Sequence, residues 1–390
     1  MSVVIVGAAR TAMGGFQGAL APVAAPQLGA SAIRAAVARA GLAPEDINET
    51  LMGCVLPAGL GQAPARQASR YAGLPDSCGA TTVNKVCGSG MKTVMFAHDL
   101  IAAGSAEVVV AGGMESMSNS PYLLPGARAG MRMGHGDVKD HMFLDGLEDA
   151  YTGRLMGSFA QATADEYSLT REAMDAFAIE SLTRAKAAIE RGAFADEITP
   201  VTVKTRKGEV TVDTDEQPGN AMPEKIPSLR PAFAKDGTIT AANASSISDG
   251  AAALVLMDEA AAKARNLTPL ARIVGQVQHA QHPSEFTVAP IGAMQKVLAK
   301  AGWQKEDVDL FEINEAFAMV TMLAINEMGL EHSKVNVNGG ACALGHPIGC
   351  SGTRLLVTLI HALKARGLKK GVASLCIGGG EATAVAIEML

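Results

Sequence analysis

Continuous apolar runs alternate along this chain with segments in which apolar residues recur every three or four positions. One helical segment begins at Gly90 and stops near Gly104, and another begins at Gly352 and stops near Gly367. Each leads into an uninterrupted apolar run that ends in glycines, VVVAGG and SLCIGGG. Uninterrupted apolar strands between helices are typical of βαβ units that bury a parallel sheet on both faces. The pattern therefore predicts a layered α/β protein with mostly parallel sheets.

The two ends of the chain repeat one another. AGLAPEDI at 40–47 matches AGWQKEDV at 301–308 without a gap. The helix-and-strand stretch that starts at Gly90 parallels the stretch that starts at Gly352. Duplication of a βαβ unit predicts two similar domains. We place the first at residues 1–118 plus 249–270 and the second at 271–390.

The region between the repeats, 119–248, has a different character. It holds a Gly- and Met-rich stretch, GARAGMRMGHGDVKDHMF, and a polar stretch with hairpin character, VTVKTRKGEVTVDTDE. A long amphipathic helix is predicted from Arg171 to Arg191, with Thr170 as its N-cap and Gly192 at its end. The pattern indicates an inserted lid or oligomerisation arm.

Composition narrows the function without deciding it. A chain of 390 residues with 48% hydrophobic and 18% charged residues indicates a globular protein of two or three domains. Only 4% of residues are aromatic and the net charge is −6, which disfavours nucleic acid as a partner. No apolar run is long enough to cross a membrane, and the first residues do not resemble a signal peptide. We expect a cytoplasmic protein.

Two cysteines and one histidine stand in glycine-rich turns with distinctive surroundings. They are Cys87 in VNKVCGSGMK, His346 in ACALGHPIGCSG and Cys376 in SLCIGGGEA. The first segment predicts a strand-turn-helix in which the helix start favours a thiolate. The six cysteines form no C-x-x-C pair and no metal-ligand spacing, so no metal is expected. Two thiols and one imidazole indicate thioester chemistry.

Five segments, taken in order, resemble the signature blocks of the thiolase family. They are VCGSGMK, RPAFAKDGTITAANASSISDGAAA, NEAFA, GGACALGHPIGCSG and CIGGG. The similarity extends over essentially the whole chain. It implies a duplicated layered α/β fold with an inserted loop domain that covers coenzyme A and helps to assemble a homotetramer, a dimer of dimers. It also implies an acyltransferase that reversibly condenses two acetyl-CoA to acetoacetyl-CoA and CoA, with no cofactor.

The same resemblance implies roles for individual residues. Cys87 becomes the acetylated nucleophile of a ping-pong reaction, and His346 becomes the base that activates it. Cys376 removes the α-proton of the second thioester. His346 and a water held by Asn314 form one oxyanion hole, and the amides of Cys87 and Gly378 form the other. From the residues alone, Asn314 could instead cap the helix that follows it.

The resemblance also implies a substrate site. Ser245 matches the family's pantetheine contact, and Met156, Phe233 and Phe317 wall the acyl pocket. Lys225 falls where relatives have a serine that contacts CoA.

Besides Lys225, three positions depart from the family's pattern. Leu155 stands where biosynthetic relatives have a histidine, and Gly219 where some have an arginine near adenine. Glu381 follows the terminal glycines in place of a methionine or glutamine, and its role is left open.

Several alternatives stay open from the sequence. A more apolar pocket at Leu155 suits a broad-range 3-ketoacyl-CoA thiolase of fatty-acid degradation. A non-catalytic, lipid-binding thiolase-like protein is a second alternative, although it would be expected to lack a nucleophile or the Gly-His-Pro turn. Ketoacyl synthases place a second histidine or an asparagine where this chain has Cys376. A dinucleotide-dependent oxidoreductase is disfavoured because no G-x-G-x-x-G follows the first strand.

Overall fold

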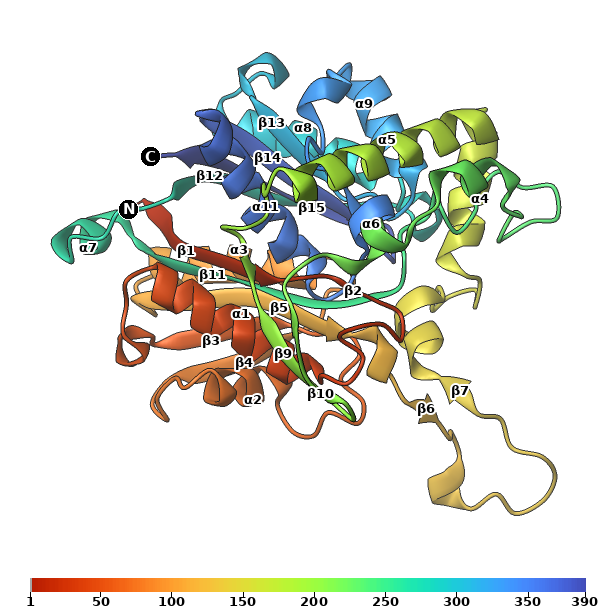
Figure 1. Ribbon diagram of the computed structural model, residues 1–390, viewed down its shortest axis with the longest axis horizontal. Coiled ribbons are helices and arrows are strands. Elements are labelled where there is room, and N and C mark those ends of the chain that lie inside the picture. Colours follow the sequence, from red (N-terminus) through yellow and green to blue (C-terminus); the bar gives the residue numbers. More distant parts are fainter. Residues whose placement is uncertain (1) are drawn as a thin grey trace.

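The computed structural model describes residues 2–390 and is built around one sheet (Figure 1). Its strands are β1 (Val3–Thr11), β2 (Gly14–Gly15), β3 (Glu49–Gly53), β4 (Gly79–Val83), β5 (Val108–Ser116), β8 (Ile198–Thr199), β11 (Ser248–Asp258), β12 (Ala271–Ala280), β13 (Leu310–Ile313), β14 (Lys370–Ile377) and β15 (Glu381–Met389). The main order is β13-β14-β15-β12-β1-β11-β5-β3-β4, while β2 pairs with β11 and β8 with β1. The repeated halves thus meet where β1 pairs with β12.

Helices cover the sheet in layers (Figure 1). They are α1 (Ala25–Arg39), α2 (Pro64–Tyr71), α3 (Ser89–Ala102), α4 (Met156–Glu166), α5 (Arg171–Glu190), α6 (Glu216–Asn220), α7 (Glu259–Ala264), α8 (Ala289–Ala301), α9 (Ala318–Met328), α10 (Ala341–Leu344) and α11 (Ser351–Arg366). The helices α1 and α2 pack on the first half of the sheet, and α8 packs on the second. Between the halves lie α3 and α11, whose apolar side chains share one core with strands of both halves. The predicted layered α/β architecture is confirmed.

The sheet is more mixed than the strand pattern predicted. The pairs β3–β4, β3–β5 and β13–β14 are parallel, as expected for βαβ units. Around them, β11 pairs antiparallel with both β1 and β5, and β15 pairs antiparallel with β12 and β14. A three-glycine turn joins β14 to β15, and so short a connection permits only antiparallel pairing.

The sequence repeat corresponds to a structural repeat. AGLAPEDI forms a 3₁₀ turn at Pro44–Asp46, and AGWQKEDV forms one at Lys305–Asp307. In each turn the aspartate accepts a hydrogen bond from the residue three positions earlier, Ala43 N–H and Gln304 N–H, both at 2.8 Å. The strands β3 and β13 follow these turns. Equivalent helices, α3 and α11, then pack against each other.

Two glycines let the helices α3 and α11 approach closely. A Cβ at Gly90 would come within 2.7 Å of Thr353 Oγ1, and one at Gly352 would overlap the backbone of Met91. The Thr353 hydroxyl also donates to Gly90 O at 2.7 Å. The close approach brings together the two helix starts, and with them the Cys87 turn and the His346 loop.

Residues between the halves form extensions from the layered body. The predicted helix is confirmed as α5, with the Thr170 Oγ1 accepting from Ala173 N–H at 3.2 Å. The predicted hairpin is confirmed as β9 (Val201–Thr205) and β10 (Gly208–Val212). An arm carrying β6 (Tyr122–Leu123) and β7 (Lys139–Asp140) projects away from the body (Figure 1). The predicted domain limits lie within two residues of the ends of β5, β11 and β12, and we retain them as a proposal.

Candidate active site

The Cys87 turn connects β4 to α3, as the strand-turn-helix pattern predicted. Val86 takes a left-handed backbone conformation at φ 47°, which is unusual for a β-branched residue and strained. Ser89 at the start of the helix holds the turn, because its hydroxyl donates to Val86 O at 2.7 Å and accepts from Lys85 N–H at 2.8 Å. The turn therefore presents Cys87 just ahead of a helix start.

The sulfur of Cys87 meets opposing electrostatic influences. The N–H groups of Gly378 and of Cys87 itself hydrogen-bond toward it and lower its pKa. Burial among apolar groups outweighs them and raises the pKa of the Cys87 thiol to about 11. Cys87 is therefore a neutral thiol in the resting protein. Both N–H groups are directed at the sulfur, and donors placed in this way can stabilise negative charge that develops next to it.

His346 lies in the turn between α10 and α11 and is nearly buried. Its Nδ1 is 2.5 Å from Ser351 Oγ, and the Ser351 hydroxyl donates its one hydrogen to Pro347 O at 2.9 Å. Nδ1 must then carry the hydrogen, which leaves Nε2 as a free acceptor. Burial, followed by the positive charge of Arg354, lowers the pKa of His346 to about 3. The imidazole is thus neutral and able to take a proton.

Cys376 is the next-to-last residue of β14 and is completely buried. Three glycines follow it, and the chain then returns along β15 with Cys376 opposite Ala382. Burial, and then the charge of a Cys87 thiolate, raise the pKa of the Cys376 thiol well above its usual value. The hairpin brings this second thiol close to Cys87, and its turn supplies the Gly378 N–H that hydrogen-bonds toward the Cys87 sulfur.

Asn314 directly follows β13 and is completely buried. Its Nδ2 lies 3.5 Å from both ring nitrogens of His346, a long contact. Its Oδ1 has no hydrogen-bond partner among residues 2–390. A buried acceptor without a partner is costly unless a water or ligand satisfies it. The alternative that Asn314 caps a helix is not supported, since α9 begins only at Ala318 and has no side-chain cap.

A cavity of about 390 Å³ opens onto these groups. Cys87, His346, Gly378 and Ser245 line it together with the predicted acyl-pocket residues Met156, Phe233 and Phe317. Phe233 and Phe317 meet edge to face, with ring centroids 6.2 Å apart. Gly157 faces the Phe233 ring so closely that a Cβ there would overlap it. Cys376 and Asn314, both completely buried, are not among the residues that line the cavity.

The sequence analysis missed several residues that line the cavity. They are Phe143, Gly146, Leu147, Phe286 and Ile348. Ile348 could have been inferred, because it lies two residues after His346. Phe143 and Phe286 lie in segments without a recognisable motif, and only the fold brings them to the cavity.

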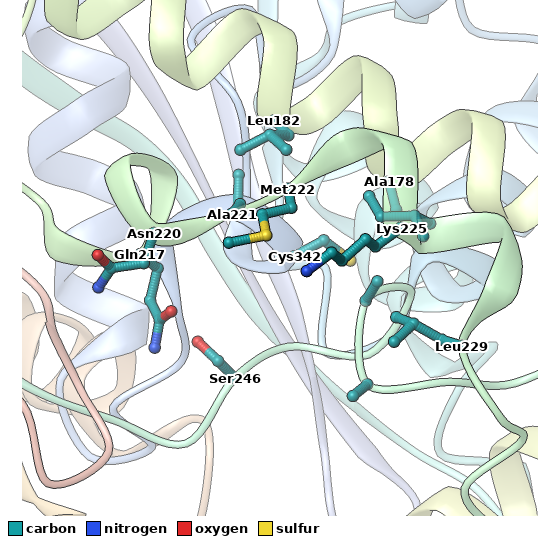
Figure 2. Close-up of a pocket in the computed structure, with 14 residues that line it drawn as sticks. Ala178, Leu182, Gln217, Asn220, Ala221, Met222, Lys225, Leu229, Ser246 and Cys342 are labelled. Atoms are coloured by element: carbon teal, nitrogen blue, oxygen red, sulfur yellow. The ribbon is translucent and has the colours of Figure 1, made fainter.

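A second cavity, of about 300 Å³, is shown in Figure 2. Its lining shares Ala241 and Ser246 with that of the first cavity. Lys225 lies here and not in the acyl cavity, and it is the one charged residue among those that line it. Gln217, Asn220 and Met222 line the same space (Figure 2). The structure thus places Lys225 in a different cavity from the other predicted substrate contacts, although the two cavities share Ala241 and Ser246 in their linings.

Neither membrane-spanning helices nor metal-ligand clusters occur in residues 2–390. No helix there is long and apolar enough to cross a bilayer. No three His, Cys, Asp or Glu side chains are grouped as metal ligands in that part of the chain.

Comparison with known proteins agrees with this geometry. The family models described as thiolase N-terminal and C-terminal domains match residues 3–260 and 267–389. Acetyl-CoA acetyltransferases of Cupriavidus necator and Escherichia coli are 53% and 52% identical over 389 residues, 99% of this chain and of each relative. The crystal structure of the Bacillus anthracis acetyl-CoA acetyltransferase, 45% identical, has a TM-score of 0.97 over 100% of this chain and 99% of its own.

A duplicated α/β fold in which one thiol and an imidazole line a cavity, with a second thiol buried close to the first, defines an acyltransferase that works through thioesters. This chain belongs to the thiolase family.

Proposed function

We propose that this protein is an acetyl-CoA C-acetyltransferase, which interconverts two acetyl-CoA with acetoacetyl-CoA and CoA. One observation carries the proposal: Cys87, neutral His346 and the Gly378 N–H line a single apolar cavity, with Cys376 buried beside them. The names of full-length relatives that are about half identical support the same activity.

The first half-reaction transfers an acetyl group to Cys87. His346 Nε2 takes the thiol proton as the sulfur attacks the thioester carbonyl, since burial disfavours a separate thiolate. The carbonyl oxygen becomes negative within reach of the N–H groups of Cys87 and Gly378. The carbon–sulfur bond to CoA then breaks, and Cys376 donates its proton to the leaving thiolate. Acetyl-Cys87, a protonated His346 and a Cys376 thiolate remain.

The second half-reaction forms the carbon–carbon bond. The Cys376 thiolate removes an α-proton from a second acetyl-CoA, while His346 and a water at Asn314 stabilise the enolate oxygen. The α-carbon attacks the acetyl carbon, the bond to Cys87 breaks, and His346 returns its proton to Cys87. All protons are then back in place. Acetyl-Cys87 cannot ionise, so the negative charge of a Cys87 thiolate, which would raise the pKa of Cys376, cannot form while the α-proton is removed.

The two adjoining cavities support a path for CoA. Ser245 lines the acyl cavity, and Lys225 lines the second cavity, where its ammonium suits a phosphate of the nucleotide end. We extend the proposal to a cytoplasmic homotetramer. The exposed apolar side chains of the β6–β7 arm, Tyr122, Leu124, Met131, Met133 and Val138, support its use in assembly.

One observation favours a second candidate function. Leu155 lines the acyl cavity where a histidine would make it more polar, so a broad-range 3-ketoacyl-CoA thiolase is the alternative. The lipid-binding, non-catalytic alternative is less well supported because both thiols and the imidazole are in place.

The test separates the two thiols. Incubation with acetyl-CoA should add one acetyl group, mapped by mass spectrometry to Cys87. Cys376→Ala should still acetylate Cys87, but it should lose exchange of the acetyl-CoA methyl protons with solvent. Cys78→Ala, at a buried thiol away from the cavity, is the matched control and should keep both reactions. Full activity in Cys87→Ser, or acetylation elsewhere, would refute the proposal.

A further inference from the structure

Glu115, the next-to-last residue of β5, is a completely buried carboxylate that the proposed reaction does not use. In the described part of the chain its partners are hydrogen-bond donors, and no cation is paired with it. A buried carboxylate without a counter-ion is costly to keep. The surrounding groups must therefore stabilise the buried carboxylate.

The donors come from two separate loops. Gly349 N–H donates to Glu115 Oε2 at 2.8 Å, and Val55 N–H donates to the same oxygen at 3.0 Å. Leu56 N–H donates to Oε1 at 3.1 Å, with the Cys54 thiol at 3.7 Å. One side chain thus connects the loop after β3 with the loop that carries His346.

The peptide of Gly349 is closely packed against Gly53, Gly113 and the Glu115 carboxylate. A Cβ at Gly53 would come within 2.7 Å of Gly349 O, and one at Gly113 would overlap that oxygen. A Cβ at Gly349 itself would come within 2.5 Å of Glu115 Oε2. The Gly349 peptide is therefore packed too tightly for a side chain at any of these three glycines.

Both loops reach the acyl cavity. Gly349 is three residues after His346. The backbone N–H of His346 donates a hydrogen bond to Ser246 O at 3.1 Å. Ile348 lines the cavity and packs with Val55 and Leu56 in one apolar cluster. A shift at Gly349 would therefore move the imidazole and part of the cavity wall together.

We propose that Glu115 is a positioning residue of the acyl-transfer site, whose ionised carboxylate fixes the 346–351 loop against the loop at 54–56. The inference rests on the proposed function. It predicts that the carboxylate sets the place of the His346 ring relative to Cys87 without touching substrate.

The charge of Glu115 matters as well as its shape. Burial raises the pKa of Glu115 to about 7, although three backbone N–H groups oppose the rise. The titratable groups that face it are the thiols of Cys54, Cys87 and Cys350, and its charge raises the pKa of each. The protonated acid would direct its O–H at groups that themselves donate, so protonation loosens the contacts.

The test compares Glu115→Gln with wild type. The amide has one accepting oxygen, so its NH₂ must face either Gly349 and Val55 or Leu56 and Cys54. Thiolysis of acetoacetyl-CoA should lose about ten- to a hundredfold in kcat, with a much smaller change in KM, because misplacement acts on the transition state. The pH midpoint for alkylation of Cys87 should move to lower pH, since a neighbouring negative charge is gone.

Glu197→Gln is the matched control, because Glu197 is equally buried but bonds Arg10 and Thr358. It should lose stability while keeping kcat and the Cys87 midpoint. A folded Glu115→Gln with kcat within twofold of an active wild type would overturn the inference. So would a loss of kcat that the control shares while the Cys87 midpoint stays in place. An inactive wild type would instead overturn the proposed function.

A second measurement needs no variant. In the wild-type protein, hydrogen exchange at the Gly349 amide, corrected for its intrinsic rate, should accelerate as the pH falls through about 7. This outcome is expected because the pKa of Glu115 is raised to about 7. Slow exchange that stays independent of pH from about 5 to about 9, a range that spans this pKa, would overturn the role of the ionised carboxylate.

Discussion

Lys85 and Glu381 form an ion pair that joins the Cys87 turn to the hairpin after Cys376. Lys85 is two residues before the nucleophile, and Glu381 is the first residue of β15, directly after the three glycines. The side chain that the sequence left without a role thus connects the two thiol-bearing loops. Glu381 is three residues after Gly378, whose N–H hydrogen-bonds toward Cys87.

We expect this ion pair to tune activity more than stability. Both side chains are partly exposed, at 18% and 35%, so a double-mutant cycle of Lys85→Met and Glu381→Gln should give a coupling energy of about 0.5–1 kcal/mol. The single variants should lower kcat by about two- to fivefold through a displaced Gly378. Salt titration of wild-type kcat checks the mechanism, because screening should imitate the single variants. Zero coupling in both stability and kcat would contradict it.

Ser351 controls which nitrogen of His346 carries the hydrogen. Ser351→Ala removes the acceptor at Nδ1, so the ring can adopt the other tautomer and lose its free Nε2. Acetylation of Cys87 should slow by about a hundredfold or more, by analogy with loss of the orienting group in other nucleophile–histidine pairs. The rate of acetyl-Cys87 formation measures this directly. Thr358→Ala, on the same helix and away from the cavity, should acetylate normally.

The reactivity of Cys87 should depend on pH in a simple way. Its pKa is raised to about 11 and that of His346 is lowered to about 3, so the resting pair is thiol and neutral imidazole at neutral pH. Alkylation of Cys87 by iodoacetamide should therefore rise about tenfold per pH unit from pH ~7 to ~10, as the thiolate fraction grows. A plateau below pH ~8 would instead reveal a thiolate–imidazolium pair.

The pH dependence of stability follows from the same shift at His346. The folded pKa lies below the unfolded value of about 6.5, so the unfolded chain binds the extra proton at acid pH. The titration of His346 therefore has no effect on the stability of the folded protein above about pH 7. It lowers that stability as the pH falls from about 6.5 toward 3. In His346→Asn that part of the acid destabilisation should disappear. Denaturant titrations of both proteins between pH ~5 and ~8 measure the difference.

Chain-length preference depends on the wall that includes Leu155. Acetoacetyl-CoA should be thiolysed with higher kcat/KM than 3-ketohexanoyl-CoA, because the rings of Phe233 and Phe317 limit the acyl cavity. Each additional methylene that the cavity cannot accommodate loses about 0.8 kcal/mol of the free energy gained from burial. Leu155→His should increase the preference for the shorter chain. Equal efficiency on both substrates would identify the broad-range alternative.

Motif residues were predictable because their chemistry is local. Cys87, His346 and Cys376 each stand in a turn whose glycines and helix start can be read from a few neighbouring residues. The internal repeat likewise predicted two matching helices, confirmed as α3 and α11. The antiparallel partners of β11 and β15 were not predictable, because apolar runs reveal burial but not the direction of the neighbouring strand.

The sequence by itself determined the layered α/β class, the repeat, the family and the three reactive side chains, because local periodicity and turn chemistry encode them. Tertiary structure alone decided how these parts meet. It joined Lys85 to Glu381, placed Lys225 in a separate cavity, and surrounded Glu115 with N–H groups from two loops. Such contacts join residues far apart in the chain, and their geometry depends on the packing of α3 against α11, which no local pattern specifies.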